Sequence, residues 1–184
     1  AQPTVAFESG GANINGSVTY TDNNDSDAST WTASYTVNSG DTDGSVTFTL
    51  DFDDLAGNSG AQVTTVTDNS SVEVDQTAIT LSSLTIASNN NNDTSLATTG
   101  DVVTLTITST EDYTSAPTVV FTGDQDNDVA VTANNNDASI YTATYTVAAN
   151  DTNGPLAFTV TSTDAAGNES TNTALINDDT GVTI

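Results

Sequence analysis

The sequence repeats itself at a spacing of 110 residues. Trp31–Gly60 aligns without a gap on Tyr141–Ser170, and fourteen of these thirty positions are identical. The similarity extends outward, because the PTVAF of Pro3–Phe7 is echoed by the PTVVF of Pro117–Phe121. A chain that carries one pattern twice is expected to fold as two units of the same kind.

The two copies differ in length. Asp68 aligns with Asp178, so one complete copy occupies residues 75–184, and residues 1–74 hold a copy without its first third. Loss of the first two strands would expose a sheet edge and leave the core unfilled. Two explanations are open: residues that precede Ala1 complete this copy, or strands of another copy fill it. We favour the first, because sandwiches are normally completed within their own chain.

Strand signals in the complete copy are short and separated by turn residues. In Tyr141–Val147, aromatic residues, Ala and Val alternate with Thr, which is typical of a strand with one face in the core. Asn153-Gly154 and Asp43-Gly44 are hairpin signals at the same place in both copies. The expected strands are Thr80–Ala87, Val102–Ser109, Thr118–Thr122, Val129–Thr132, Tyr141–Val147, Leu156–Thr161 and Thr173–Ile176, of which the shorter copy would keep the last five. Seven strands in about 110 residues predict an all-β fold of tandem immunoglobulin-like β-sandwich repeats.

Every side chain that is charged at neutral pH is anionic. The chain has 25 Asp and Glu residues, no Lys, Arg or His, and a formal net charge of -25. Nucleic acids and anionic membranes are bound mainly through Lys and Arg, so neither is an expected partner, and no apolar run is long enough for membrane insertion. Without imidazole, thiol or amine groups we expect no enzyme. A glycosidase with two carboxylates is disfavoured, because the acidic residues lie in repeated turns.

Acidic side chains recur at predicted strand ends and in loops. In the absence of Cys and His, only oxygen ligands are available, and these suit calcium above other metals. The main predicted calcium ligands would gather at one end of each copy. They are Asp54, Asn58, Asp68 and Asp75 at the end of the first copy, beside the start of the second, and the equivalent cluster Asp164, Asn168, Asp178 and Asp179 in the second copy. A second group of candidates is Asp51, Asp53, Asp124, Asp126 and Asp128. There are two alternatives to bound calcium. One is turn capping by Asp and Asn side chains, which for Asp41 and Asp151 is as strongly favoured as calcium binding. The other is diffuse screening of the carboxylates by salt.

Four short motifs together resemble the bacterial immunoglobulin-like repeats of large surface adhesins and biofilm proteins. They are the Tyr-Thr-Val of Tyr145–Val147, the turn Asp151–Gly154, the Phe-Thr of Phe158–Thr159 and the D-x-A-G-N of Asp164–Asn168. The resemblance implies an extender or fibre segment of an exported cell-surface protein, with repeats stacked end to end and stiffened by calcium at their junctions. The absence of Lys and Arg departs from the usual pattern. It leaves a self-assembling extracellular filament, sheath or surface-layer subunit, joined by strand complementation, as an alternative.

A carbohydrate-binding module of a secreted protein is a further alternative. Trp31, the only tryptophan, aligns with Tyr141, and an aromatic residue at the start of a strand more often packs in a core than binds a sugar. The expected partners are other copies or neighbouring repeats of the same protein. Glycans could be attached at the Asn-x-Ser/Thr sequences of Asn15, Asn24, Asn69, Asn92, Asn150 and Asn168.

Overall fold

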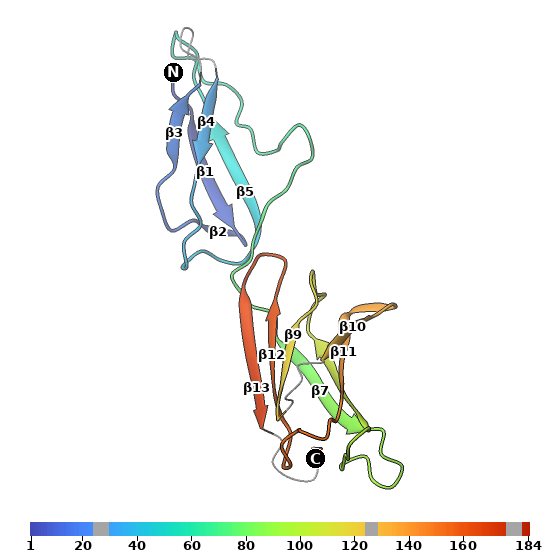
Figure 1. The fold of residues 1–184 in the computed structure, drawn as a ribbon. Coiled ribbons are helices and arrows are strands. Elements are labelled where there is room, and N and C mark those ends of the chain that lie inside the picture. Colours follow the sequence, from blue (N-terminus) through green and yellow to red (C-terminus); the bar gives the residue numbers. More distant parts are fainter. Residues whose placement is uncertain (24–29, 124–128, 176–181) are drawn as a thin grey trace. The chain divides into compact units, whose positions relative to one another are not determined.

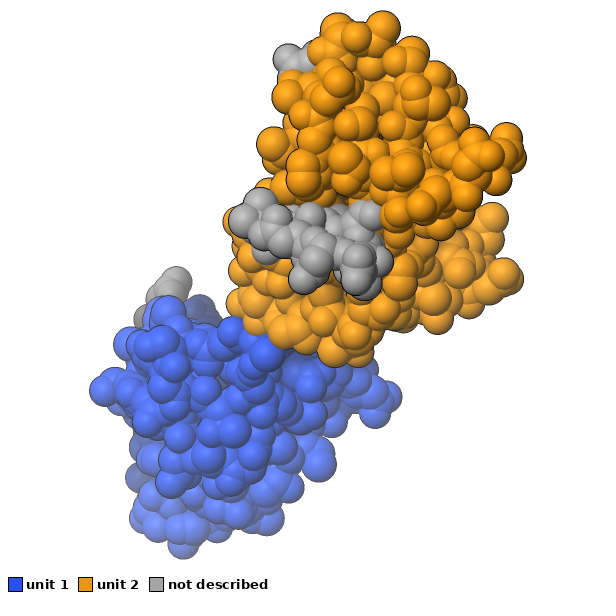
Figure 2. Space-filling model, turned by 90° about the horizontal axis from the view of Figure 1, so that it is seen from below, with its two compact units in different colours: residues 1–77 blue, residues 78–184 orange. Residues whose placement is uncertain are grey.

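The structure is a computed structural model that describes residues 1–23, 30–123, 129–175 and 182–184. Within these ranges all regular structure is β, and the strands pair in antiparallel sheets, which confirms the predicted all-β class (Figure 1). None of the described residues forms a helix that could cross a membrane. The chain divides into two compact units, Ala1–Thr77 (unit 1) and Ala78–Ile184 (unit 2), which Figure 2 colours separately.

Unit 2 contains two antiparallel sheets. The first has the strand order β10-β11-β8-β7 and the second the order β13-β12-β9. The strands are β7 (Leu81–Ser88), β8 (Val102–Ser109), β9 (Thr118–Thr122), β10 (Ala130–Asn134), β11 (Asp137–Thr146), β12 (Ala157–Thr163) and β13 (Glu169–Leu175). All seven predicted strands occur. Several bounds differ by a few residues, and β11 starts earlier than predicted because its pairing with β10 continues to Asp137.

The core of unit 2 forms from the inward faces of both sheets. In β8, Val103, Leu105 and Ile107 are fully buried and alternate with half-buried polar residues. They belong to one apolar cluster with Phe121 of the second sheet, whose ring centroid lies 4.9 Å from that of Tyr145 on β11. Alternation with period two therefore places one continuous apolar face on each sheet, and each face covers the other.

Unit 1 also contains two sheets. One has the order β2-β1-β5-β6, and the other is the pair β3-β4. The strands are β1 (Thr4–Ser9), β2 (Ala12–Asn13), β3 (Thr19–Asp22), β4 (Trp31–Ser34), β5 (Gly44–Asp51) and β6 (Glu73–Val74). The Tyr20 hydroxyl accepts a hydrogen bond from Val5 N at 2.8 Å and donates one to Val5 O at 3.2 Å, which connects the smaller sheet to the larger.

The backbone pairing of unit 1 recurs in unit 2. Phe7 lies opposite Phe48 in the β1–β5 ladder, and Phe121 lies opposite Phe158 in the β9–β12 ladder. Two residues before these phenylalanines of β5 and β12, Val46 N donates to Val72 O at 2.8 Å, and Leu156 N donates to Val182 O at 2.9 Å. These ladders and edge contacts therefore pair the same aligned residues in both units.

One strand predicted for unit 1 does not form. The segment equivalent to β13 makes only isolated bridges, one between Val63 and Leu50 of β5 and one between Ser59 and Asp53, which follows β5. Val63 and Val66, which follow β5 in this segment, are exposed. A strand forms at this edge only where side-chain packing supports the ladder, and that support is weaker in unit 1 than in unit 2.

Candidate functional site

The D-x-A-G-N sequences form the same closed loop in both units. Asp54 Oδ1 accepts hydrogen bonds from Ala56 N at 2.8 Å and Asn58 N at 2.9 Å, and Asp54 Oδ2 accepts one from Asn58 Nδ2 at 2.8 Å. Asp164 accepts bonds from Asn168 N at 2.8 Å and Asn168 Nδ2 at 2.9 Å. The motif is thus a turn in which each carboxylate is already satisfied by N–H donors of its own loop.

These hydrogen bonds stabilise the ionised carboxylates. The pKa of Asp54 lies below its ordinary value because the Asn58 side chain and backbone donate to it. For Asp164, burial opposes ionisation and would raise its pKa, but the bonds from Asn168 and Gly167 together lower it. Both loops therefore favour a charged carboxylate without a cation from the protein.

A second polar cluster surrounds the buried carboxylate of Asp41. It accepts hydrogen bonds from Asn38 N at 2.8 Å, from Asn15 N at 2.7 Å and from the Tyr35 hydroxyl. These bonds, that of Asn38 first and that of Tyr35 next, lower the pKa of Asp41 to about 2. The cluster connects the segments after β2 and β4 to the turn before β5. In unit 2, Asp151 accepts the equivalent bond from Ala148 N at 2.7 Å.

Residues predicted to form one calcium site in unit 1 are distributed along it. Asp54 follows the end of β5, whereas Asp75 follows Val74, which pairs with Gly44 at the start of β5. The eight residues of β5 span about 23 Å, so Asp54 and Asp75 cannot share an ion with ligand distances of about 2.4 Å. Asp68 accepts a bond from Ser70 N at 3.0 Å and Asp75 one from Thr77 N at 3.0 Å, so both cap local turns.

The other candidate ligands have separate local partners or cannot be placed. Asp51 accepts a hydrogen bond from Gln62 Nε2 at 3.0 Å, and Asp53 accepts one from Ser59 Oγ at 2.7 Å. No three acidic side chains gather around a common point in residues 1–23, 30–123, 129–175 and 182–184. Asp124, Asp126, Asp128, Asp178 and Asp179 lie outside the described residues. Asp164 and Asn168 are together, but as the two ends of one turn.

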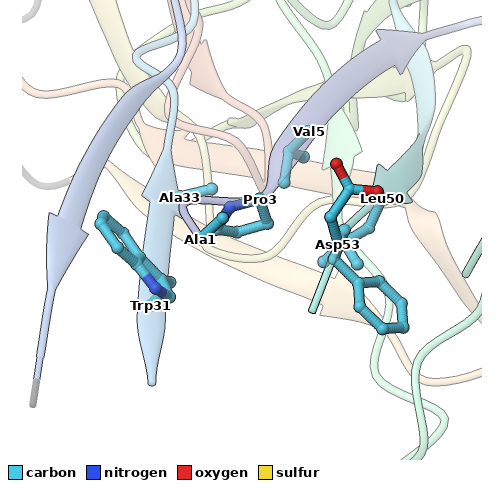
Figure 3. A pocket seen from close by; sticks show the side chains of 8 residues that line it. Ala1, Pro3, Val5, Trp31, Ala33, Leu50 and Asp53 are labelled. Atoms are coloured by element: carbon cyan, nitrogen blue, oxygen red, sulfur yellow. The ribbon is translucent and has the colours of Figure 1, made fainter. Parts of the chain in front are cut away.

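A mainly apolar hollow of about 400 Å³ lies between the two sheets of unit 1. Figure 3 shows Trp31 and Ala33 of β4 on one side and Val5 of β1 with Leu50 of β5 on the other. Pro3, Phe52, Ala1 and Asp53 complete the lining. Trp31 is half-buried in this lining, which resembles an open core more than a platform for a sugar.

A second hollow of about 150 Å³ lies farther along the same strands. Its lining is apolar apart from Ser9 and the Tyr35 hydroxyl, and it consists of Phe7, Ser9, Ile14, Tyr35, Val37, Val46, Val72 and Val74. The Asp41 cluster holds the Tyr35 side of this hollow in place. Both hollows therefore lie on the inward face that the alternating sequence creates.

Valines at aligned positions are much more exposed in unit 1 than in unit 2. Val37 is 50% exposed and Val72 is 66% exposed, whereas their counterparts Val147 and Val182 are 2% and 1% exposed. In unit 2 the covering side chains include Ile79, Val103, Leu105 and Ile107, all from the first third of the copy. In the described residues, the open apolar face of unit 1 is thus the main difference between the two units.

No protein-family model, curated protein or solved structure matches this chain. A functional assignment therefore depends on the geometry of the two units and on the chemistry of their surfaces. The strongest internal comparison is the one between the units themselves, because aligned residues have the same strand neighbours but different burial.

Sequence analysis identified Asp41 as a turn residue but missed its partners Asn15 and Tyr35. Asn15 lies 26 residues away in sequence, and only the fold brings it to the carboxylate. The alignment of Tyr35 with Tyr145 signals a core position, and it does not indicate a hydroxyl that donates to Asp41. Local spacing therefore contains no signal for this cluster.

Substitution Asp41→Asn is expected to lower the unfolding midpoint of unit 1 at neutral pH and to flatten its acid sensitivity. With a folded pKa of about 2 against an ordinary 3.8, the Asp41 carboxylate stabilises the fold above about pH 4 and loses this effect as the pH falls toward 2. Fluorescence of Trp31 during acid titration in denaturant reports on unit 1 alone. Glu8→Gln, at an exposed position of β1, is the control, and equal acid curves for D41N and the parent would contradict the assignment.

Proposed function

We propose that the two units are successive immunoglobulin-like sandwiches of an exported, repeat-built surface protein, and that they serve as a structural extender without catalytic activity. The observation that carries this proposal is the recurrence of the same backbone pairing in both units at the spacing of the sequence repeat. Proteins built from such repeats gain length by adding units, each with its own core.

The topology of unit 2 supports the immunoglobulin-like assignment. Named A to G in chain order, its strands β7 to β13 form the sheets A-B-E-D and C-F-G, which is the arrangement of constant-type immunoglobulin domains. In unit 1, β1, β3, β4 and β5 take the places of C, D, E and F. A separate core in each unit suits a chain that carries tension between neighbouring repeats.

The surface chemistry supports an extracellular location. Thr and Ser hydroxyls line the exposed faces of the strands, carboxylates gather in the turns, and a net charge of -25 keeps neighbouring molecules apart unless salt screens them. The chain contains no Cys, so its fold does not depend on the redox state of its compartment.

Single-molecule pulling of the whole chain tests the extender function. Two unfolding events are expected, releasing about 28 nm of extended chain for unit 1 and about 38 nm for unit 2. Unit 2 should unfold at the higher force because its core is complete. Leu105→Ala should weaken only the longer event, whereas Val120→Ala, at an exposed position on β9, should leave both unchanged. One cooperative event, or none above the noise, would contradict two separate load-bearing units.

Calcium stiffening of repeat junctions is the second part of this proposal. We expect submillimolar CaCl2 to raise the thermal midpoint more than NaCl of equal ionic strength, and EGTA to reverse the difference, because ordered sites bind the folded state alone. Circular dichroism of the whole chain, with Trp31 fluorescence for unit 1, measures both responses. Coincident calcium and sodium curves would leave only the screening of repelling carboxylates.

A further inference from the structure

We propose that Asn69 and Asn92 are attachment sites for an N-linked oligosaccharide on the folded protein, and that Asn15 and Asn168 are not. This inference rests on the proposed function, because an exported chain meets the membrane enzymes that transfer such oligosaccharides. All four residues belong to Asn-x-Ser/Thr sequences, so the sequence alone does not separate them. The fold separates them, because it leaves some of these amides and hydroxyls exposed and uses others in hydrogen bonds.

The transfer reaction needs an accessible amide. The sugar donor is an oligosaccharide joined through pyrophosphate to a membrane lipid. The Asn Nδ2 forms a bond to the anomeric carbon of the first sugar, the bond from that carbon to the pyrophosphate oxygen breaks, and the amide gives up one proton as the lipid pyrophosphate leaves. The Ser or Thr hydroxyl two residues later must also reach the enzyme. A usable site therefore has an amide nitrogen and a hydroxyl that the fold does not hold.

Asn69 presents its amide at a turn in the long loop between β5 and β6 (Figure 1). Ser70 N donates to the Asp68 carboxylate at 3.0 Å, which closes this turn locally. Asn69 has a φ of 60°, a left-handed conformation that asparagine adopts more readily than most residues. The side chains of Asn69 and Ser71 are exposed and make no hydrogen bond to another described residue. Both groups of this site are therefore accessible.

Asn92 lies in the loop between β7 and β8, where a neighbouring side chain holds the backbone in place. Asn90 Oδ1 accepts a hydrogen bond from Asn92 N at 3.0 Å, and Asn90 Nδ2 donates to the Asp101 carboxylate at 2.8 Å. The side chain of Asn92 is exposed, as is Thr94, and neither side chain bonds to a described residue. The loop thus keeps its shape without using the amide of Asn92.

The amide of Asn15 is already used by the Asp41 cluster. Its Nδ2 donates to Gly40 O and, at 3.2 Å, to Asp41 Oδ1. Its backbone N donates to the same carboxylate oxygen at 2.7 Å. Although Asn15 lies at the surface, transfer of a sugar to its Nδ2 requires that this cluster first opens.

The sequence of Asn168 is closed at both of the groups that the enzyme needs. Asn168 Nδ2 donates to Asp164 Oδ2 at 2.9 Å. The hydroxyl oxygen of Ser170 is buried, and Ser170 lies opposite Ser162 in the β12–β13 ladder. Transfer to Asn168 therefore requires both the turn and the start of β13 to open.

Two further sequences of this type belong to neither group. Asn24 lies outside the described residues. Asn150 is exposed, but the carboxylate of Asp151 after it accepts a bond from Ala148 N at 2.7 Å. Its turn is thus intermediate between the open and the closed sites.

Transfer to the whole folded chain by a purified single-subunit oligosaccharyltransferase tests the four sites. The donor is a lipid-pyrophosphate-linked oligosaccharide, and the enzyme is one that glycosylates four synthetic peptides centred on these asparagines. Asn69 and Asn92 of the folded chain should react within about threefold of their peptides, because exposed loops need little opening. Asn15 and Asn168 should react at least about tenfold more slowly than theirs, because a bond from an amide to a carboxylate must first break. Digestion with an Asp-specific protease and mass spectrometry locate each oligosaccharide.

Variants of the hydroxyl residues are the matched controls. Ser71→Ala and Thr94→Ala keep each asparagine but should abolish its glycosylation, whereas Thr94→Ser should retain it. Ser17→Ala, which removes the hydroxyl of the Asn15 sequence at an exposed position, should leave the pattern of the folded chain unchanged.

Two results would overturn the inference. One is a folded chain that stays unmodified at Asn69 and Asn92 while their peptides react. The other is a folded chain in which Asn15 or Asn168 reacts as fast as its peptide. The pulling experiment measures the two units without any sugar, so it succeeds or fails separately. Failure of the extender function is therefore distinguishable from failure of the attachment sites.

Discussion

A β-sheet with apolar side chains on one face is stable in water only when a second layer covers that face. In unit 2 this cover is complete, because Val103, Leu105 and Ile107 of β8 are fully buried in one cluster with Phe121 and Tyr145. In unit 1 the same inward face is built by equivalent strands, but the side chains that would cover it are missing from the described residues. The difference in cover explains the difference in burial between aligned valines.

The second constraint is electrical. A chain without Lys, Arg or His cannot neutralise its carboxylates with its own cations, so each buried or half-buried carboxylate must be satisfied by N–H and O–H donors. The buried carboxylates of Asp41 and Asp164 achieve this with turn amides, Asn side chains and a Tyr hydroxyl, and the exposed Asp54 has the same turn bonds as Asp164. The acidic residues therefore determine where the turns close, and their remaining repulsion is left to dissolved ions.

The strands of unit 2 were predictable because alternation and turn residues are local features of the sequence. The repeat spacing also predicted which strands of unit 1 have counterparts. The missing strand after β5 was not predictable in this way, because Val63 and its neighbours form a full ladder only where tertiary packing supports it. The two hollows follow from the absence of the first two strands, which sequence analysis had inferred.

The predicted calcium cluster illustrates the limit of linear reasoning. Asp54 follows the last residues of β5, whereas Asp75 follows β6, which pairs with the first residues of β5. The two side chains therefore lie at opposite ends of β5. Only the direction of each strand in the sheet decides which loops meet, and the sequence does not state it. The Asp41 cluster was missed for a related reason, since Asn15 approaches Asp41 through the chain path after β2.

Amide hydrogen exchange measured by mass spectrometry tests most directly whether the two units share one architecture but differ in cover. Protection should be clearly lower in β4 of unit 1 than in β11 of unit 2, and in β5 than in β12, because the partners equivalent to β8 and β13 are not present as strands in the described residues of unit 1. Equal protection of the two sets of strands in the isolated chain would contradict an open core in unit 1.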